Sequence, residues 1–201
     1  MIPFLTGLGA GLSLIVAIGA QNAFVLKQGI KREAVLAVVL VCLLSDAFLI
    51  LAGVAGIGAL IQSAPALLAV VRWVGVAFLV AYAAFAAKRA LQPGTLKAST
   101  SPGKGTVWSA ALTAAALTWL NPHVYLDTLV LLGSLANAQG GTGRWVFGAG
   151  AATASALWFP LVGYGARGLS NFFARPASWR ILDGGVAVLM LTLAVVLAMG
   201  R

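Results

Sequence analysis

The stretch from residue 34 to residue 71 constrains the fold most, because it holds one charged residue, Asp46, in 38 positions. An α-helix of that length would measure about 57 Å, nearly twice the hydrocarbon thickness of a bilayer. The segment therefore has to fold back on itself, and Gln62-Ser63-Ala64-Pro65 is the expected turn. This pattern predicts two membrane-spanning helices in succession.

Composition extends this prediction to the whole chain. Hydrophobic residues make up 61% of the 201 positions, mean hydropathy is +1.01, and there are 13 Lys or Arg and 4 Asp or Glu. A soluble domain has roughly a quarter of its residues charged, about three times the share found here. A water-soluble fold of this length could not bury so much apolar surface. We therefore expect an all-α, polytopic membrane protein.

Charges and turn residues divide the chain into six apolar segments. We expect spans at about 3–26, 34–61, 66–87, 108–136, 145–166 and 180–200. The segment 88–107 is basic and rich in Pro, Gly and Ser, which predicts a flexible linker. It separates a first three-helix repeat, 1–87, from a second, 108–201. We expect residues 3–20 to belong to the first span and not to a signal peptide, because no positive charge precedes the apolar run.

The distribution of Lys and Arg predicts the orientation in the membrane. Ten of the 13 lie in three loops, at 27–33, 88–107 and 167–180. By the positive-inside rule these loops face the cytoplasm and both termini face outward. The net charge of +9 is then an orientation signal, and we expect no binding to nucleic acid. The single cysteine, Cys42, excludes an internal disulfide and a cysteine-rich metal site, and we expect no cofactor.

The two halves of the chain resemble each other. The corresponding pairs are Asn22 with Asn121, and Ser45, Gly53 and Gly58 with Ser155, Gly163 and Gly168, the last three at a constant offset of 110 positions. Because each half has three spans, an odd number, the second half must be inverted in the membrane. Many secondary transporters are built in this way, with the substrate site near the midplane between the repeats. We therefore predict two inverted three-helix repeats.

Two acidic residues are candidates for function because they fall inside predicted spans. Asp46 is surrounded by apolar residues, where a carboxylate costs about 2.5–3.5 kcal/mol on insertion scales. Such a residue normally faces a cavity or a partner, although it can also serve only to hold a neighbouring helix. Asp127 lies four residues after His123, on the same helical face. Both Asp127 and His123 are candidate substrate ligands, and mutual neutralisation is the alternative.

The dipeptide Asn121-Pro122 interrupts the fourth span. Proline lacks an N–H and clashes with the preceding turn, so the helix kinks or breaks here. Asn121 can then cap a new half-helix that has Pro122 at its first position, with a positive end suited to a substrate carboxylate. Gly19-Ala20-Gln21-Asn22 is the expected matching irregularity in the first span. An ordinary proline kink is the alternative.

Together these features predict a site for a small cationic zwitterion. Two carboxylates favour an ammonium group and a positively charged side chain, while neutral amides and a half-helix end favour an α-carboxylate. Moving one positive charge outward against an inside-negative potential costs about 2.3 kcal/mol per 100 mV. Export therefore requires coupling, for which inward-moving protons are available. A carboxyl group held away from water can carry such a proton, and we prefer Asp46 to Asp127 for this role because it is nearer the midplane.

Three motifs are similar to those of a known family. They are GAQNAFVLKQGIKRE at 19–33, LVCLLSDAFLILAGVAGIG at 40–58 and TWLNPHVYLDTLVLLGS at 118–134. In this order they resemble the LysE/ArgO family of basic amino acid exporters, over essentially the whole chain. The resemblance implies a bacterial inner-membrane exporter of L-lysine and/or L-arginine driven by the proton-motive force. By motif, the family's site residues fall on Gln21, Asn22, Asp46, Asn121, Pro122 and Asp127. The chain departs from the pattern at Ala20, where many relatives carry proline.

Other functions stay open at this stage. A related exporter of neutral amino acids such as homoserine or threonine is the first alternative. Efflux of a divalent metal is the second, although hard ions need several oxygen ligands. An enzyme is not expected, because the glycine-rich context of intramembrane aspartyl proteases is missing around Asp46 and Asp127, and a purely structural membrane protein is a further reading. A bundle of this size could also form a homodimer through a glycine stripe.

Overall fold

The computed structural model describes residues 1–16, 19–58, 65–91, 104–169 and 176–199, and within these ranges the chain contains helices and no strand. The elements are α1 (Ile2–Ile15), α2 (Ala20–Lys31), α3 (Val35–Val54), α5 (Pro65–Leu91), α6 (Lys104–Trp119), α7 (Pro122–Val124), the π-helical η1 (Tyr125–Leu132), α8 (Gly133–Asn137), α9 (Gly143–Gly165), the 3-10 turn η2 (Ala166–Leu169) and α10 (Pro176–Met199). The all-α prediction is confirmed.

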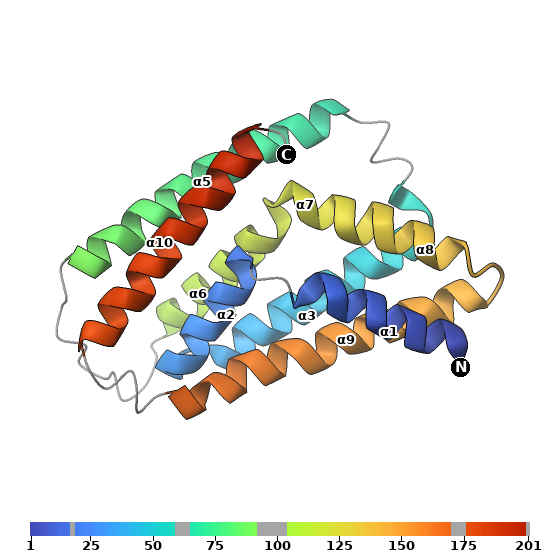
Figure 1. Ribbon diagram of the computed structural model, residues 1–201, viewed down its shortest axis with the longest axis horizontal. Helices are drawn as coiled ribbons and strands as arrows, with labels where there is room; N and C mark the ends of the chain where they lie inside the picture. The colour runs from blue at the N-terminus through green and yellow to red at the C-terminus, as the bar shows by residue number, and fades with distance from the viewer. Residues whose placement is uncertain (17–18, 59–64, 92–103, 170–175, 200–201) are drawn as a thin grey trace.

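The helices α3 and α9 pack against each other in opposite directions at the centre of the molecule (Figure 1). Gly148 near the start of α9 faces Val54 at the end of α3, and Gly163 near the end of α9 faces Val35. Helix α1 lies along α9, and α6 packs on α3. The helices α5 and α10 form a separate antiparallel pair along one side of the molecule (Figure 1).

Glycine permits the closest of these helix contacts. Gly7 of α1 is buried, and a Cβ atom there would overlap the backbone carbonyl of Phe147 in α9. Gly150 of α9 lies in the same way against the backbone of Phe4. Small residues allow such an approach in membrane helices. The glycine stripe of α1 is therefore used inside the chain and is not open to a second copy.

Within the part of the chain that the structure describes, four helices are long and apolar enough to cross a membrane, at Val35–Val54, Ala69–Leu91, Gly143–Gly168 and Ala177–Met199. The helices α1 and α2 count together as a fifth candidate, with an 81° bend between them. Helix α6 has an apolar stretch at Val107–Trp119, which at about 20 Å is too short to cross alone. The first predicted span is thus a bent pair of helices, and the fourth is divided among α6, α7, η1 and α8, so the described helices give up to five of the six predicted spans.

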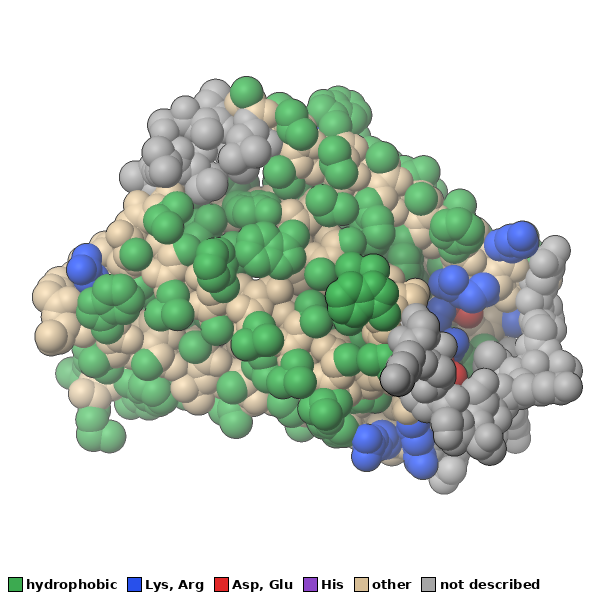
Figure 2. Space-filling model, turned by 180° about the vertical axis from the view of Figure 1, so that it is seen from behind, with side chains coloured by type: hydrophobic (Ala, Val, Ile, Leu, Met, Phe, Trp, Pro, Cys, Tyr) green, Lys and Arg blue, Asp and Glu red, His purple; other side chains and the backbone are tan. Residues whose placement is uncertain are grey.

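The outer surface of the bundle is apolar. Large side chains of different helices are exposed, among them Leu44 of α3, Leu161 of α9 and Val188 of α10. Figure 2 shows hydrophobic side chains over most of one face, and Lys and Arg side chains gathered mainly at one end of it. This separation fits a multi-pass membrane protein whose hydrocarbon-facing surface is flanked by a basic end.

The loops differ from their predicted bounds. Helix α5 continues to Leu91 and α6 begins at Lys104, so both ends of the predicted linker 88–107 are helical. The remainder of the linker, most of the expected turn at 62–65 and residues 170–175 lie outside the described residues. The chain turns between the predicted spans 108–136 and 145–166, as expected, with left-handed glycines at Gly140 and Gly141.

The placement of Lys27 in a loop was wrong. Lys27 lies in α2, which continues to Lys31 and ends where Arg32 takes a left-handed backbone with φ of 58°. The Lys27 side chain is buried, because it pairs with the carboxylate of Asp183 in α10. A charge count along the sequence cannot reveal a partner 156 positions away.

Candidate functional site

The fourth predicted span breaks at Asn121. Asn121 has an extended backbone (φ −100°, ψ 106°), and its side-chain oxygen accepts a hydrogen bond from the backbone N–H of His123 at 3.1 Å. Pro122 occupies the first helical position, where its missing N–H costs nothing. The chain then continues as α7, η1 and α8. The predicted cap and break are therefore confirmed.

The first predicted span breaks at the matching place. Helix α1 ends at Ile15, and α2 begins at Ala20 after Gly19, whose backbone is extended (φ −112°, ψ 177°). The side-chain nitrogen of Asn22 donates to the carbonyl oxygen of Ile15 at 2.6 Å, which satisfies an end of α1 across the break. The irregularity predicted at Gly19–Asn22 is confirmed, and it forms without a proline at position 20.

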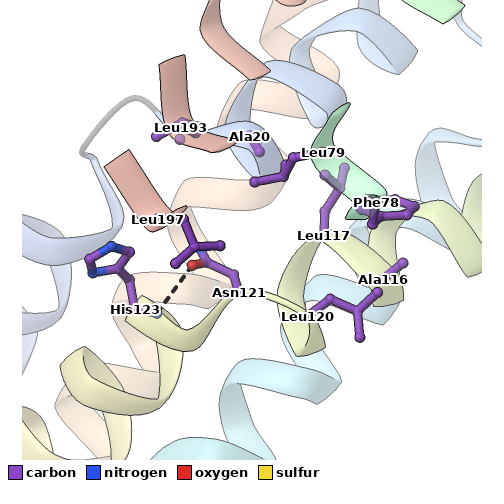
Figure 3. Close-up of a pocket in the computed structure, with 11 residues that line it drawn as sticks. Ala20, Phe78, Leu79, Ala116, Leu117, Leu120, Asn121, His123, Leu193 and Leu197 are labelled. Atoms are coloured by element: carbon purple, nitrogen blue, oxygen red, sulfur yellow. Dashed lines mark hydrogen bonds between the residues drawn. The ribbon is translucent and has the colours of Figure 1, made fainter. Parts of the chain in front are cut away.

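A cavity of about 60 Å³ joins the two breaks. It is lined by Gly19 and Ala20 of the first break, by Leu120, Asn121 and His123 of the second, by Ala116 and Leu117 of α6, by Phe78 and Leu79 of α5, and by Leu193 and Leu197 of α10. In Figure 3 the Asn121 side chain bonds the backbone of His123 beside this space. The polar lining comes from the second break, and the remaining walls are apolar.

A polar network behind the breaks connects four helices. Asp46 of α3 is 8% exposed and accepts a hydrogen bond from the hydroxyl of Ser155 in α9 at 2.8 Å. Its neighbour Ser45 accepts from the indole N–H of Trp119 in α6 at 3.0 Å. The side-chain oxygen of Asn22 in α2 accepts from the indole of Trp158 in α9 at 3.2 Å. The repeat or the motifs had already singled out Asn22, Ser45, Asp46 and Ser155.

Gln21, a predicted substrate ligand, presents an unused donor. Its side-chain nitrogen is buried and makes no hydrogen bond within the part of the chain that the structure describes. Leaving a buried donor unpaired costs about 1–3 kcal/mol. Gln21 follows Ala20, a cavity-lining residue, in the first turn of α2.

The structure does not bring the two predicted carboxylates together. Asp127 lies on η1 and is exposed, and the residue after it, Thr128, packs against Gly53 of α3. Gly53 is seven residues beyond Asp46, a distance of about 10 Å along α3. Across the described residues no hydrogen bond or ion pair joins Asp46 to Asp127, and neither residue lines the cavity.

The sequence reasoning overlooked Asp183, the fourth acid of the chain. It lies two turns inside α10 and is 6% exposed. Its carboxylate accepts from Lys27 of α2 and, at 3.3 Å, from Arg89 of α5. The sequence did contain an indication, because Asp183, like Asp46, is an acidic residue within an apolar segment and therefore needs a polar or charged partner. Among the described residues no group of three or more His, Cys, Asp or Glu is arranged to hold a metal ion.

Comparison with known proteins gives consistent matches over nearly the whole chain. A family model described as LysE type translocator matches residues 12–201. The chain is 44% identical to the lysine exporter LysE of Corynebacterium efficiens, over 96% of both chains, and 42% identical to that of Corynebacterium glutamicum, again over 96% of both. It is 42% identical to the arginine exporter protein ArgO of Pectobacterium carotovorum, over 97% of this chain and 96% of the relative. No solved structure matches the chain.

Proposed function

The chain belongs to the LysE type translocator family, and on this basis we propose that it exports the cationic amino acids L-lysine and L-arginine across the bacterial inner membrane. The main support for this proposal is that relatives named as lysine exporters and as an arginine exporter are 42–44% identical to this chain over at least 96% of its length. Transport, not an enzymatic reaction, is the activity of this family as its description gives it.

The substrate site lies at the cavity between the two helix breaks. The first turn of α2, after the first break, presents backbone N–H groups, which favour an anionic group such as the α-carboxylate. Gln21 and Asn22 lie in this turn. The second break contributes the side chains of Asn121 and His123 and the turn fixed by Pro122, because Pro122 has no N–H and the His123 N–H is already bonded to the Asn121 side chain. At about 60 Å³ the cavity holds a few water molecules and is smaller than lysine or arginine, so substrate binding requires it to widen.

The packing supports two inverted three-helix repeats. Helix α1 packs on α9 as α6 packs on α3, and α3 with α9 and α5 with α10 are antiparallel pairs between the halves. At one place Gly29 of α2 meets the backbone of Gly163 in α9, and at the corresponding place Gly133 of α8 meets that of Gly53 in α3. Gly53 and Gly163 are one of the sequence-matched pairs. Asp46 of the first repeat, in contrast, corresponds to Ala156 of the second, so only the first repeat has a carboxyl group at this position.

Asp46 is assigned as the proton carrier and Asp127 as a ligand for the cationic end of the substrate. Asp46 is buried, and its hydrogen-bond donor in the described part of the chain is the neutral hydroxyl of Ser155. Because no cation of the described residues pairs with this buried carboxylate, a bound proton can neutralise it. Asp127 is exposed one turn past His123, on the half of the span that leads away from the break. Proton antiport then supplies the energy for moving a cation outward.

The orientation follows the positive charge. The end of the bundle that carries Lys31, Arg32 and Lys88 faces the cytoplasm, and the opposite end, with the α8–α9 turn and the C-terminus, faces outward.

Counterflow in proteoliposomes tests this function. Vesicles that contain the purified protein and unlabelled L-arginine should accumulate labelled L-arginine and L-lysine, and not labelled homoserine, threonine, leucine or Mn²⁺. Accumulation of homoserine or threonine without the cationic amino acids would favour a neutral amino acid exporter. Accumulation of Mn²⁺ would favour metal efflux.

A further inference from the structure

Three charged side chains meet near the basic end of the bundle: Lys27 of α2, Arg89 of α5 and Asp183 of α10. One carboxylate oxygen of Asp183 accepts from both the Lys27 ammonium and the Arg89 Nε, the latter at 3.3 Å. The side chains of Lys27 and Asp183 are 5% and 9% exposed, while that of Arg89 is 42% exposed. The cluster thus has a buried ion pair and one outer cation.

The cluster lies between the cavity and the cytoplasm. The same three helices line the cavity, through Ala20 of α2, Leu79 of α5 and Leu193 of α10. The charged member of each helix is seven or ten residues from its cavity residue, about 10–15 Å along the helix. In each helix this displacement is toward the end that carries the predicted cytoplasmic loops. A substrate moving from the cytoplasm to the cavity along these helices therefore reaches the cluster first.

An aromatic layer fills the interval between the cluster and the cavity. The ring of Tyr82 in α5 contacts that of Phe24 in α2, with centroids 6.2 Å apart, and that of Phe78, with centroids 6.3 Å apart. Phe78 lines the cavity on one side. On the other side the Arg89 guanidinium lies 5.8 Å from the centre of the Tyr82 ring. The ionic and aromatic groups together form a layer between the cavity and the end of these helices that carries the predicted cytoplasmic loops.

The cations held by Asp183 are the two groups that the proposed substrates carry, an ammonium and a guanidinium. We propose that the ionic and aromatic layer closes the cavity toward the cytoplasm, and that Asp183 is the cytoplasmic docking carboxylate for the cationic end of the substrate, which replaces Arg89 there and opens this closed layer. This inference rests on the proposed export of lysine and arginine. Arg89 is the cation displaced because it is the exposed one, whereas removal of Lys27 would leave a buried charge without its partner. The Tyr82 ring then offers its face to the incoming cation.

Transport from the cytoplasmic side tests the docking role. In inside-out vesicles Arg89→Gln should lower the half-saturating concentration of L-arginine and L-lysine about two- to fivefold, because it removes the competing cation of a partly exposed ion pair. Lys88→Gln, the same charge change at the adjacent exposed lysine, is the matched control and should have no effect. Equal behaviour of the two variants would overturn the proposal.

The role of the Asp183 carboxylate is tested by removing it together with its buried partner Lys27, so that neither charge is left buried alone. Lys27→Gln with Asp183→Asn removes both members of the buried pair, and it should raise the half-saturating concentration by about tenfold, the effect of losing a charge-assisted contact. The amount of folded protein in detergent is measured in parallel. A folded double variant that transports with the original half-saturating concentration would exclude Asp183 as a docking group.

A labelling experiment separates this proposal from the proposed function. In a Cys42→Ala background, Ala116→Cys places a thiol at the cavity wall, and a membrane-impermeant maleimide is applied from the cytoplasmic side. Arg89→Gln should accelerate maleimide labelling of the introduced thiol, and Lys88→Gln should not. In the protein that carries only Cys42→Ala and Ala116→Cys, added L-arginine should change the labelling rate and L-leucine should not. If Arg89→Gln is labelled faster but the protein does not transport arginine, the proposal of a closed layer stands and the proposed export function is wrong. Transport with identical labelling in all variants would refute the docking role alone.

Discussion

Asp46 and Asp127 have different surroundings, although both are acids in apolar sequence. Asp46 is buried and bonded by Ser155, which suits a group that exchanges a proton inside the bundle. Asp127 is exposed on η1, which suits contact with the cationic end of a substrate as it enters or leaves the protein. The predicted pair thus acts, in our assignment, at two places along the path. Asp183 adds a third acid, nearest the cytoplasm.

The assignment of Asp46 is tested by Asp46→Asn. This variant keeps the shape and the hydrogen-bonding capacity of the side chain but cannot carry a proton, so uphill export of labelled arginine and lysine should fall to background. Glu33→Gln makes the same chemical change outside the spans, at a residue paired only distantly with Lys31 (4.0 Å), and should leave export unchanged. The amount of protein in the membrane fraction should be equal for both. Normal efflux through Asp46→Asn would contradict the assignment.

At the scale of elements, the helix contacts depend on the absence of side chains at particular glycines. Gly7→Ala should lower the thermal unfolding midpoint in detergent, because its Cβ would overlap the Phe147 backbone and push α1 away from α9. Gly9→Ala, two residues along the same helix, meets no atom within 4 Å and should be neutral or stabilising by up to about 1 kcal/mol. Indistinguishable midpoints would show that α1 does not pack on α9 in this register.

The sequence predicts the helices and their breaks because both follow from local chemistry. Apolar runs give the spans, the missing N–H of Pro122 breaks the fourth span, and Gly19 permits the extended residue in the first. It cannot predict where the chain points after a break, and for this reason it assigned Asp46 and Asp127 to one site without indicating how far apart they lie. The ion pair of Lys27 with Asp183 was missed for a related reason, because it depends on how α2 packs on α10.

At the scale of the whole molecule, the two broken spans meet at one cavity, and the basic residues gather at one end (Figures 1 and 2). This arrangement places the docking cluster, the closed layer and the cavity in series across the bundle. Alternation between the two sides would then require α5 and α10 to move against α2 and α6, because the cavity lies between these elements.

The direction of this series is checked with a reporter fused after Arg201. The distribution of positive charges predicts that the loops at 27–33 and 88–107 face the cytoplasm and that the C-terminus faces outward. An alkaline phosphatase fused after Arg201 should therefore be active, since this enzyme folds only outside the cytoplasm. The same reporter inserted within 92–103 should be inactive. The reverse pattern would invert the molecule and place the Asp183 cluster on the outer side.

Exchange of cationic amino acids for protons is the central claim, and a pH dye inside proteoliposomes measures it directly. Vesicles loaded with L-arginine and diluted into arginine-free buffer should acidify internally as arginine leaves and protons enter, with no acidification for L-leucine or for Asp46→Asn. Exit of labelled arginine without any change of internal pH, or equal acidification with leucine, would contradict the account.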